Sequence, residues 1–126
     1  MEMTRNAVSW FEIPTADFGR AKAFYSTIFD FEMPEMPMGP TRLGILLLES
    51  DGGIGGAIIE DPNQSPGASG ARVYLSGGTD LAVVLARVES AGGVVVVSKT
   101  EIAPGMGHFA LFRDTEGNVL GLHSMS

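Results

Sequence analysis

The stretch SWFEIPTADFGRAKAFY, residues 9–25, decides the fold. Apolar and polar residues alternate in its first part, which predicts a strand over 7–13. Side chains two positions apart share one face of a strand, so Trp10 and Glu12 lie together. One face of this strand therefore carries an aromatic ring and a carboxylate side by side.

A helix is predicted directly after this strand. Pro14 ends the alternation, and Asp17 is placed to cap the N-terminus of a helix over 17–29. Apolar residues then recur at helical spacing: Phe18, Ala21, Tyr25, Ile28 and Phe29. The segment is therefore predicted to be an amphipathic helix with one buried side.

The rest of the first half predicts strands joined by turns. Residues 33–40 are rich in methionine and proline. This is typical either of a short strand leading into a mobile loop that could cover a ligand, or of a surface hairpin with buried methionine tips. Strands are expected over 42–50 and 54–60, with a turn between them. Residues 61–70 are rich in turn formers and are interpreted as a linker.

The same order of elements is predicted a second time. Thr79 or Asp80 should cap a second helix, and Asp17 and Asp80 lie half of the 126-residue chain apart. The apolar face of this helix consists of Leu81, Val84, Leu85 and Val88. Gly92 or Gly93 should end the helix in the left-handed conformation. Strands are predicted over 71–76, 94–98, 107–114 and 119–123, with a turn at 115–118.

The predicted fold class is α+β, built from two βαβββ modules. The modules span about 5–61 and 70–125 of a single domain over 1–126. Each half is too small to bury its sheet alone, so the two should pack together. We expect a curled mixed sheet with helices on its outer face and a concave cavity on the other.

Composition excludes several classes of partner. The chain has no cysteine, so neither a disulfide framework nor a Cys-based zinc site is possible. A formal charge of −7 argues against nucleic acid, which requires a basic face. The apolar runs ILLL and VVVV are too short to span a bilayer, and the N-terminus lacks a signal pattern. We therefore expect a cytoplasmic protein that binds neither nucleic acid nor membrane.

Three stretches of the chain carry a family resemblance: FEIPTADFGRAKAFY, RVYLSGGTDLAVVLARVESAGG and FRDTEGNVLGLHS. They resemble the vicinal oxygen chelate superfamily, which contains lactoylglutathione lyase (glyoxalase), bleomycin resistance proteins and extradiol dioxygenases. The resemblance covers essentially the whole chain and is closest to the glyoxalase-like bacterial branch. It implies the fold, whereas the activity must be argued from the site.

The resemblance also implies where a metal ion would lie. The four ligand positions of metal-using members fall here on Trp10, Gly56 or Ala57, Arg72 and Gly121. None of these residue types is a usual metal ligand, and a guanidinium repels a divalent cation. We therefore expect no cofactor, no standard metal site and no ordinary glyoxalase activity.

The alternation predicts which residues line the cavity. The concave side should carry Trp10, Glu12, Arg72, Tyr74, Gly121 and His123. The opposite faces should pack against the helices through Phe11, Ile13, Val73, Leu75, Leu120 and Leu122. The division indicates a polar and aromatic cavity behind an apolar core.

Such a cavity suits a small organic ligand. Arg72 could bind a carboxylate or phosphate, and Trp10 and Tyr74 could sandwich a planar or aliphatic part. Glu12 could act as a general base if it is buried. Gly121, like Gly56, would leave room for the ligand.

Two alternatives remain open at these positions. Glu12 and Arg72 could simply pair across neighbouring strands, which is a structural role. Glu12, His108 and His123 could instead form a displaced two-His, one-carboxylate metal set, although they come from three separate strands. Otherwise His108 lies at a loop edge, and His123 lies at the cavity mouth or in a dimer contact.

Three functions are consistent with the sequence. The first is a metal-independent homodimer that binds a small organic ligand, anionic or neutral, as bleomycin resistance proteins do. The second is a metal-dependent lyase, isomerase or dioxygenase related to lactoylglutathione lyase. The third is a subunit with a vestigial cavity whose surface binds a partner. A homodimer is expected from the resemblance and because open sheet edges need protection.

Overall fold

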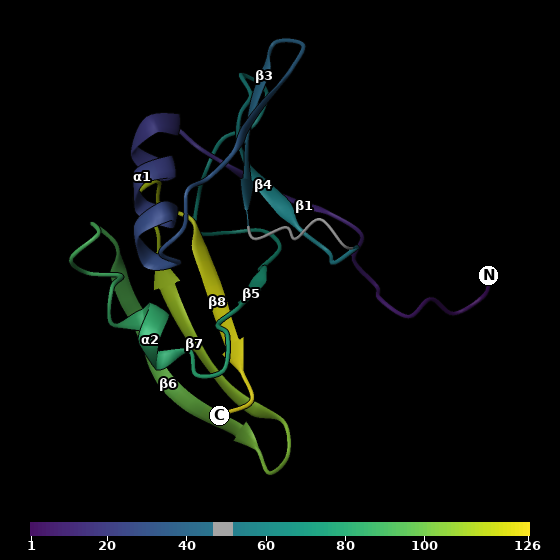
Figure 1. Ribbon diagram of the computed structural model, residues 1–126, viewed down its shortest axis with the longest axis vertical. Helices are drawn as coiled ribbons and strands as arrows, with labels where there is room; N and C mark the ends of the chain where they lie inside the picture. The colour runs from purple at the N-terminus through teal and green to yellow at the C-terminus, as the bar shows by residue number, and fades with distance from the viewer. Residues whose placement is uncertain (47–51) are drawn as a thin grey trace.

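The computed structural model describes residues 1–46 and 52–126, which form two mixed four-stranded sheets (Figure 1). The first sheet has the order β1 (Phe11–Pro14), β4 (Gly56–Glu60), β3 (Thr41–Leu46) and β2 (Glu35–Met38). The second has the order β5 (Tyr74–Ser76), β8 (Val119–Ser124), β7 (Gly107–Arg113) and β6 (Val94–Ala103). Each half of the chain thus contributes one sheet.

The pairing within the two sheets follows one pattern. In each sheet the first strand of the half runs parallel to the last, and the remaining pairs are antiparallel. This confirms the predicted α+β fold with two βαβββ modules. One detail differs, because within the described residues the modules form two separate sheets rather than one curled sheet.

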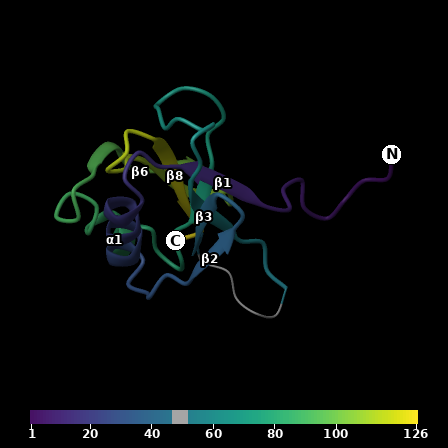
Figure 2. The same cartoon turned by 90° about the horizontal axis from the view of Figure 1, so that it is seen from above.

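Helix α1 (Phe18–Ile28) confirms the prediction made from residues 17–29. Asp17 is the N-cap, and its side chain accepts a hydrogen bond of 3.0 Å from the Arg20 N–H. The buried side of the helix consists of Phe18, Ala21, Phe24, Tyr25 and Ile28. Seen from above, α1 lies on the opposite side of the molecule from the extended N-terminal segment (Figure 2).

Helix α2 (Ala82–Leu85) is shorter than predicted. Its N-cap residue is Leu81, which makes no side-chain capping hydrogen bond, rather than the predicted Thr79 or Asp80. Asp80 lies one residue earlier, and its Oδ1 accepts a 2.9 Å hydrogen bond from the Ala82 N–H. The chain then continues in turns to Gly92, which has the expected positive φ of 108°. Valines at 83, 84 and 88 lower helix propensity because β-branched side chains lose rotamer freedom, which explains the single regular turn.

Several strands differ in length from their predictions. β1 starts at Phe11 and β5 at Tyr74, so Trp10 and Arg72 precede their strands. β6 continues to Ala103, beyond the predicted 94–98. The predicted strand over 42–50 is observed to Leu46, and its remainder lies outside the described residues.

The methionine-rich segment forms a hairpin. β2 pairs with β3 through Met36 and Met38 opposite Leu43 and Thr41. The hairpin prediction is confirmed, but its buried tips are not, since Met36 and Met38 are exposed. Met33, just before β2, is the methionine that packs into the core.

One apolar core joins the two halves. It contains α1, residues of both sheets and the apolar side of the second helical segment. The predicted helix-facing residues lie in or against it: Phe11, Ile13, Val73, Leu75, Leu120 and Leu122. Neither helix described in residues 1–46 and 52–126 has the length and apolar character needed to cross a bilayer.

Candidate functional site

Two hollows meet at Tyr74. One, of about 470 Å³, lies on the open face of the second sheet and is lined by Tyr74, Glu101, Ile102, Phe109 and His123. The other, of about 490 Å³, lies between the β5 segment and the start of β1, where Trp10, Arg72 and Tyr74 contribute to its wall. Both are open to solvent and large enough for a small organic molecule.

Strand pairing explains the position of the Tyr74 ring. β5 and β8 run in parallel with Tyr74 opposite Gly121. A Cβ atom on Gly121 would overlap the Tyr74 ring, so the ring occupies the space that any other residue would fill. The predicted room at Gly121 is therefore wrong, and the same holds at Gly56, where a Cβ would meet the Phe11 ring at 2.5 Å.

Most of the predicted site residues line two adjoining hollows in the structure. Trp10, Arg72 and Tyr74 share the larger hollow, and His123 joins Tyr74 in the other. The His123 Nε2 lies 2.9 Å from the Met106 carbonyl oxygen, which orients its ring. The predicted residues are thus neighbours, although they are divided between adjoining hollows.

Glu12 lies at a third, smaller hollow of about 170 Å³, which Arg72 also borders. Within the described residues no hydrogen bond or ion pair joins these two side chains. Their strands belong to different sheets, so the cross-strand pairing considered above does not arise. Glu12 is exposed in the single chain, and the burial that its role as a base requires is absent there.

The residues of the displaced metal set do not converge. His123 pairs with Phe109 on the open face of the sheet, whereas His108 pairs with Ser124 on the helix side. Within residues 1–46 and 52–126 no three His, Cys, Asp or Glu side chains cluster as a metal site. The residues at the family's ligand positions do not fit a metal ion either, because Trp10 and Arg72 offer no usual donor and Gly121 has no side chain.

Sequence reasoning missed Phe109 and Ile102 as wall residues. On β8, Gly121 pairs with Tyr74 and His123 pairs with Phe109. Because Gly121 and His123 are two residues apart, Tyr74 and Phe109 lie on the same face of the sheet. The alternation over 107–113 could have identified Phe109. The register of β6 shifts between Glu101 and Ala103, so simple alternation along the strand does not predict which face Ile102 lies on.

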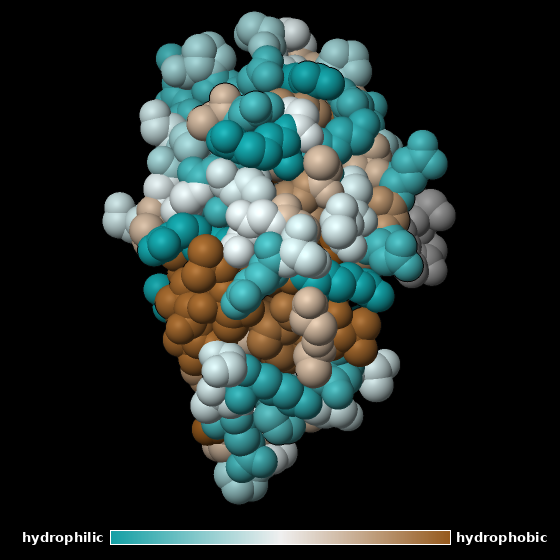
Figure 3. Space-filling view, turned by 90° about the vertical axis from the view of Figure 1, so that its left-hand side faces the viewer, coloured by the Kyte–Doolittle hydropathy of each residue, from teal (hydrophilic) through white to brown (hydrophobic). Residues whose placement is uncertain are grey.

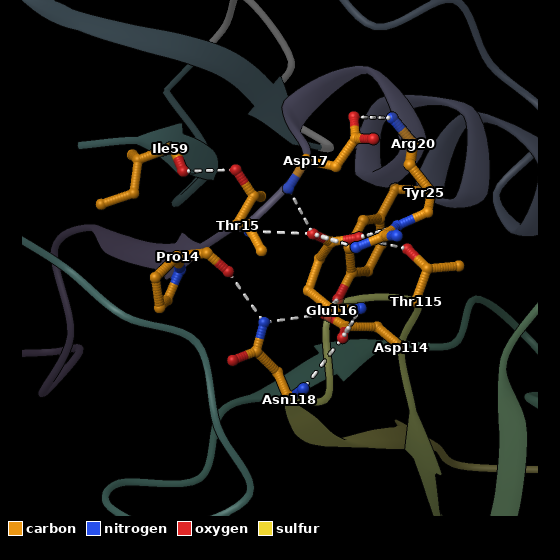
Figure 4. Close-up of polar contacts among 11 residues, drawn as sticks. Pro14, Thr15, Asp17, Arg20, Tyr25, Ile59, Asp114, Thr115, Glu116 and Asn118 are labelled. Carbon is orange, nitrogen blue, oxygen red and sulfur yellow. Dashed lines mark hydrogen bonds and ion pairs between the residues drawn. The ribbon is translucent and has the colours of Figure 1, made fainter. Parts of the chain in front are cut away.

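A polar cluster at the turn between β7 and β8 was also missed (Figure 4). The Glu116 side chain is fully buried and its carboxylate accepts hydrogen bonds from the backbone N–H groups of Ala16 and Asp17 at 2.8 and 2.7 Å. The Arg20 guanidinium adds two more, at 2.8 and 3.1 Å, and the Thr115 hydroxyl adds another at 2.8 Å. Glu116 thus ties the turn between β7 and β8 to the start of α1.

The neighbouring residues of this turn complete the connection. The Asp114 carboxylate accepts a 2.7 Å hydrogen bond from the buried Tyr25 hydroxyl. The Asn118 amide donates to the Pro14 carbonyl at 2.9 Å, and its oxygen accepts from the Gly67 N–H at 3.0 Å. The turn therefore holds α1, β1 and the linker at once.

Electrostatics indicate that this cluster is structural. Burial acts to raise the pKa of Glu116, but hydrogen bonds from Arg20, the Asp17 N–H and Thr115 outweigh it and lower the pKa to about 2. Burial, and secondly the Asp114 carboxylate, raises the pKa of Tyr25 well above its usual range. These groups bind one another, which is typical of a structural cluster.

Comparison with known proteins identifies the fold. The family model described as "Bleomycin resistance protein-like N-terminal" matches residues 8–41. TnmS3, an antibiotic binding protein from Streptomyces sp. CB03234, is 25% identical, with 99% of this chain and 100% of that chain covered at a TM-score of 0.69. None of the curated proteins compared with the chain matches it.

More distant structures share the same architecture. A glyoxalase/bleomycin resistance protein from Albidiferax ferrireducens T118 is 15% identical, with 96% and 100% of the two chains covered at a TM-score of 0.69. The fosfomycin resistance protein FosX from Listeria monocytogenes, solved with Mn(II), is 14% identical, with 98% and 95% covered at a TM-score of 0.66. The predicted resemblance to the vicinal oxygen chelate superfamily is confirmed.

Proposed function

We propose that the protein is a metal-independent, cytoplasmic homodimer that binds a small organic ligand in the hollows around Tyr74. The observation that carries the proposal is the chemistry of these walls. Where metal-using relatives place ligands, this chain has Trp10, Arg72 and Gly121, and the surrounding surface is aromatic and apolar.

The side chains of this surface suit capture rather than catalysis. The face of the second sheet near Tyr74 presents Phe109 and Ile102, which favour burial of apolar ligand surface. Arg72 is exposed at the edge of the larger hollow and can take an anionic substituent of the ligand. Glu12, the candidate base, lies in a different hollow from Phe109 and His123.

Two of the structural neighbours support the choice of ligand class. TnmS3 is described as an antibiotic binding protein, and FosX is a fosfomycin resistance protein solved with Mn(II) and a dihydroxypropylphosphonic acid. The first is thus described as binding an antibiotic and the second as complexed with a small phosphonic acid, which supports a small-molecule ligand here. Trp10, Arg72 and Gly121 offer no usual metal ligand, which favours ligand binding without a metal ion in this chain.

Exposed apolar groups support a homodimer. Trp10 is 38% exposed and Tyr74 is 50% exposed in the single chain, and both face open hollows. Figure 3 shows a hydrophobic patch on the side of the molecule where α2 and β6 lie. On these two elements Val83, Val94 and Val96 are exposed. A second copy that covered one of these surfaces would remove apolar area from water and enclose the ligand.

The proposal is tested by ligand titration with and without metal. The protein is dialysed against EDTA and titrated calorimetrically with 2-naphthoate, and the titration is repeated with Mn²⁺, Zn²⁺ or Ni²⁺ added. We expect the same dissociation constant in every case and no metal that copurifies at one ion per chain. Stoichiometric metal, or ligand binding only when metal is present, would instead support the lyase, isomerase or dioxygenase alternative.

A further inference from the structure

The Tyr74 ring lies over Gly121 and forms an aromatic surface between the two hollows. The two residues are direct partners in the parallel pairing of β5 and β8. A Cβ atom on Gly121 would overlap three ring carbons of Tyr74. The ring therefore lies against the backbone of β8, and half of the residue's surface remains exposed.

We propose that the Tyr74 ring, seated on Gly121, is the stacking surface for a flat aromatic carboxylate, with Gly121 as its positioning residue. This inference rests on the proposed function and adds the chemical class of the ligand. One face of the ring is covered by the strand, so the opposite face is the one available to a ligand.

Neighbouring rings extend this surface. Gly121 and His123 lie on the same face of β8, and His123 is paired with Phe109 of β7. The 470 Å³ hollow is thus bordered by the rings of Tyr74, Phe109 and His123. Aromatic rings prefer offset or edge-to-face contact with other rings, so a flat aromatic ligand makes better contact here than a saturated one of equal size.

Charge sets the orientation of the ligand. Arg72 borders the larger hollow together with Tyr74, whereas Glu101 borders the other. A ligand carboxylate is attracted to the guanidinium and repelled by the Glu101 carboxylate. The aromatic part therefore lies toward Phe109 and the carboxylate toward Arg72.

The experiment compares 2-naphthoate with its saturated counterpart, decahydro-2-naphthoate, by calorimetry on the full chain. The wild type should bind the aromatic acid at least several-fold more tightly. Tyr74→Ala should weaken naphthoate binding about tenfold, since loss of an aromatic contact is worth roughly one factor of ten, and Tyr74→Phe should restore most of that loss. Met38→Ala, at a residue as exposed as Tyr74 but on the first sheet, should leave binding unchanged.

A double-mutant cycle distinguishes an effect of Gly121 on the position of the Tyr74 ring from a general loss of stability. Gly121→Ala displaces the ring, so we expect it to weaken naphthoate binding several-fold in the wild type and to have no further effect in the Tyr74→Ala background. A thermal melt reports whether each variant folds. If Gly121→Ala fails to fold, the comparison of Tyr74→Ala with Tyr74→Phe still tests whether the Tyr74 ring is the stacking surface.

The outcomes distinguish the two proposals. Equal affinity for both acids, with no loss in Tyr74→Ala, overturns the stacking surface and leaves ligand binding in place. Independent, additive effects of the Gly121 and Tyr74 changes overturn the positioning role. No binding of either acid overturns the inference, and binding that appears only with added metal overturns the proposed function as well.

Discussion

At the scale of single residues, Glu116 joins the two halves of the chain through one carboxylate. It lies in the turn after β7, yet its partners Ala16, Asp17 and Arg20 lie at the start of α1. A buried carboxylate is stable only when its oxygens accept hydrogen bonds, and here five donors surround it. The turn sequence thus fixes the position of α1, which in turn supports the sheets that carry the site.

We predict that Glu116→Gln lowers the free energy of unfolding by about 2–3 kcal/mol, because charge-assisted hydrogen bonds are lost. The loss is measured by urea unfolding at neutral pH. Glu35→Gln is the matched control: hydrogen bonds from Arg42 and Lys22 also lower the pKa of Glu35 to about 2, but its partners lie at the surface. A loss in the control as large as in Glu116→Gln would contradict the role of burial.

The same residue predicts a pH dependence. The pKa of Glu116 is about 2 in the folded chain against an ordinary value of 4.5. A lowered folded-state pKa stabilises the protein above pH 4.5, and this stabilisation is lost as the pH falls toward 2. Unfolding curves of the wild type between pH 6 and pH 2.5 should show this decline, and those of Glu116→Gln should decline less. Parallel pH profiles would refute the assignment.

At the scale of elements, the two helices show how capping and composition act together. Both begin after an aspartate whose side chain accepts a backbone N–H. α1 continues for 11 residues, whereas α2 has only 4 regular residues. The N-cap Asp17 of α1 makes a side-chain capping hydrogen bond, whereas the N-cap Leu81 of α2 makes none. The valines after Asp80 lower helix propensity as well, so both features favour a shorter α2.

We predict that Asp17→Ala destabilises the protein by about 1 kcal/mol, the usual contribution of an N-cap side chain. Asp17→Asn should keep most of the stability, because an asparagine oxygen can accept the same Arg20 N–H. Chemical denaturation of the three proteins checks this. If Asn were as damaging as Ala, the charge or another contact, rather than the cap, would be responsible.

At the scale of the whole molecule, the open hollows provide a way to test the proposed homodimer. Trp10 is the only tryptophan in the chain and is 38% exposed, so its fluorescence reports on this surface. We predict a homodimer in sedimentation experiments at micromolar concentration. Dilution that dissociates the dimer should shift the tryptophan emission to longer wavelength, because water reaches the indole ring.

Two results would refute parts of this prediction. A monomer at all concentrations that still binds ligand would show that one chain is sufficient. A dimer whose tryptophan emission does not change on dissociation would place the interface elsewhere, and the hydrophobic surface over α2 and β6 would be the next surface to test.

Much of the architecture follows from local patterns. The alternation and capping signals around Asp17 predicted the first strand and α1, and their recurrence half a chain later predicted the duplication. The parity of the strands also separated core residues such as Ile13 and Leu122 from cavity residues such as Tyr74. These features depend on the period of each element, which neighbouring residues determine.

The site itself depended on contacts between distant residues. Sequence parity placed Gly121 and Tyr74 on the same concave side but could not show that the two are partners or that the ring fills the space above the glycine. It also left open a pairing of Glu12 with Arg72, whereas within the described residues no ion pair joins the two side chains. The role of Glu116 was invisible, because its five donors come from four residues, three of them at the start of α1.

The sequence by itself determined the class of fold, the two modules and the core faces. Each of these depends on residue type and on spacing along the chain. Only the tertiary structure decided which hollows exist, that Tyr74 separates them, and that a turn carboxylate connects the halves. Packing and hydrogen bonding between residues far apart in sequence determine these features, and no local period encodes them.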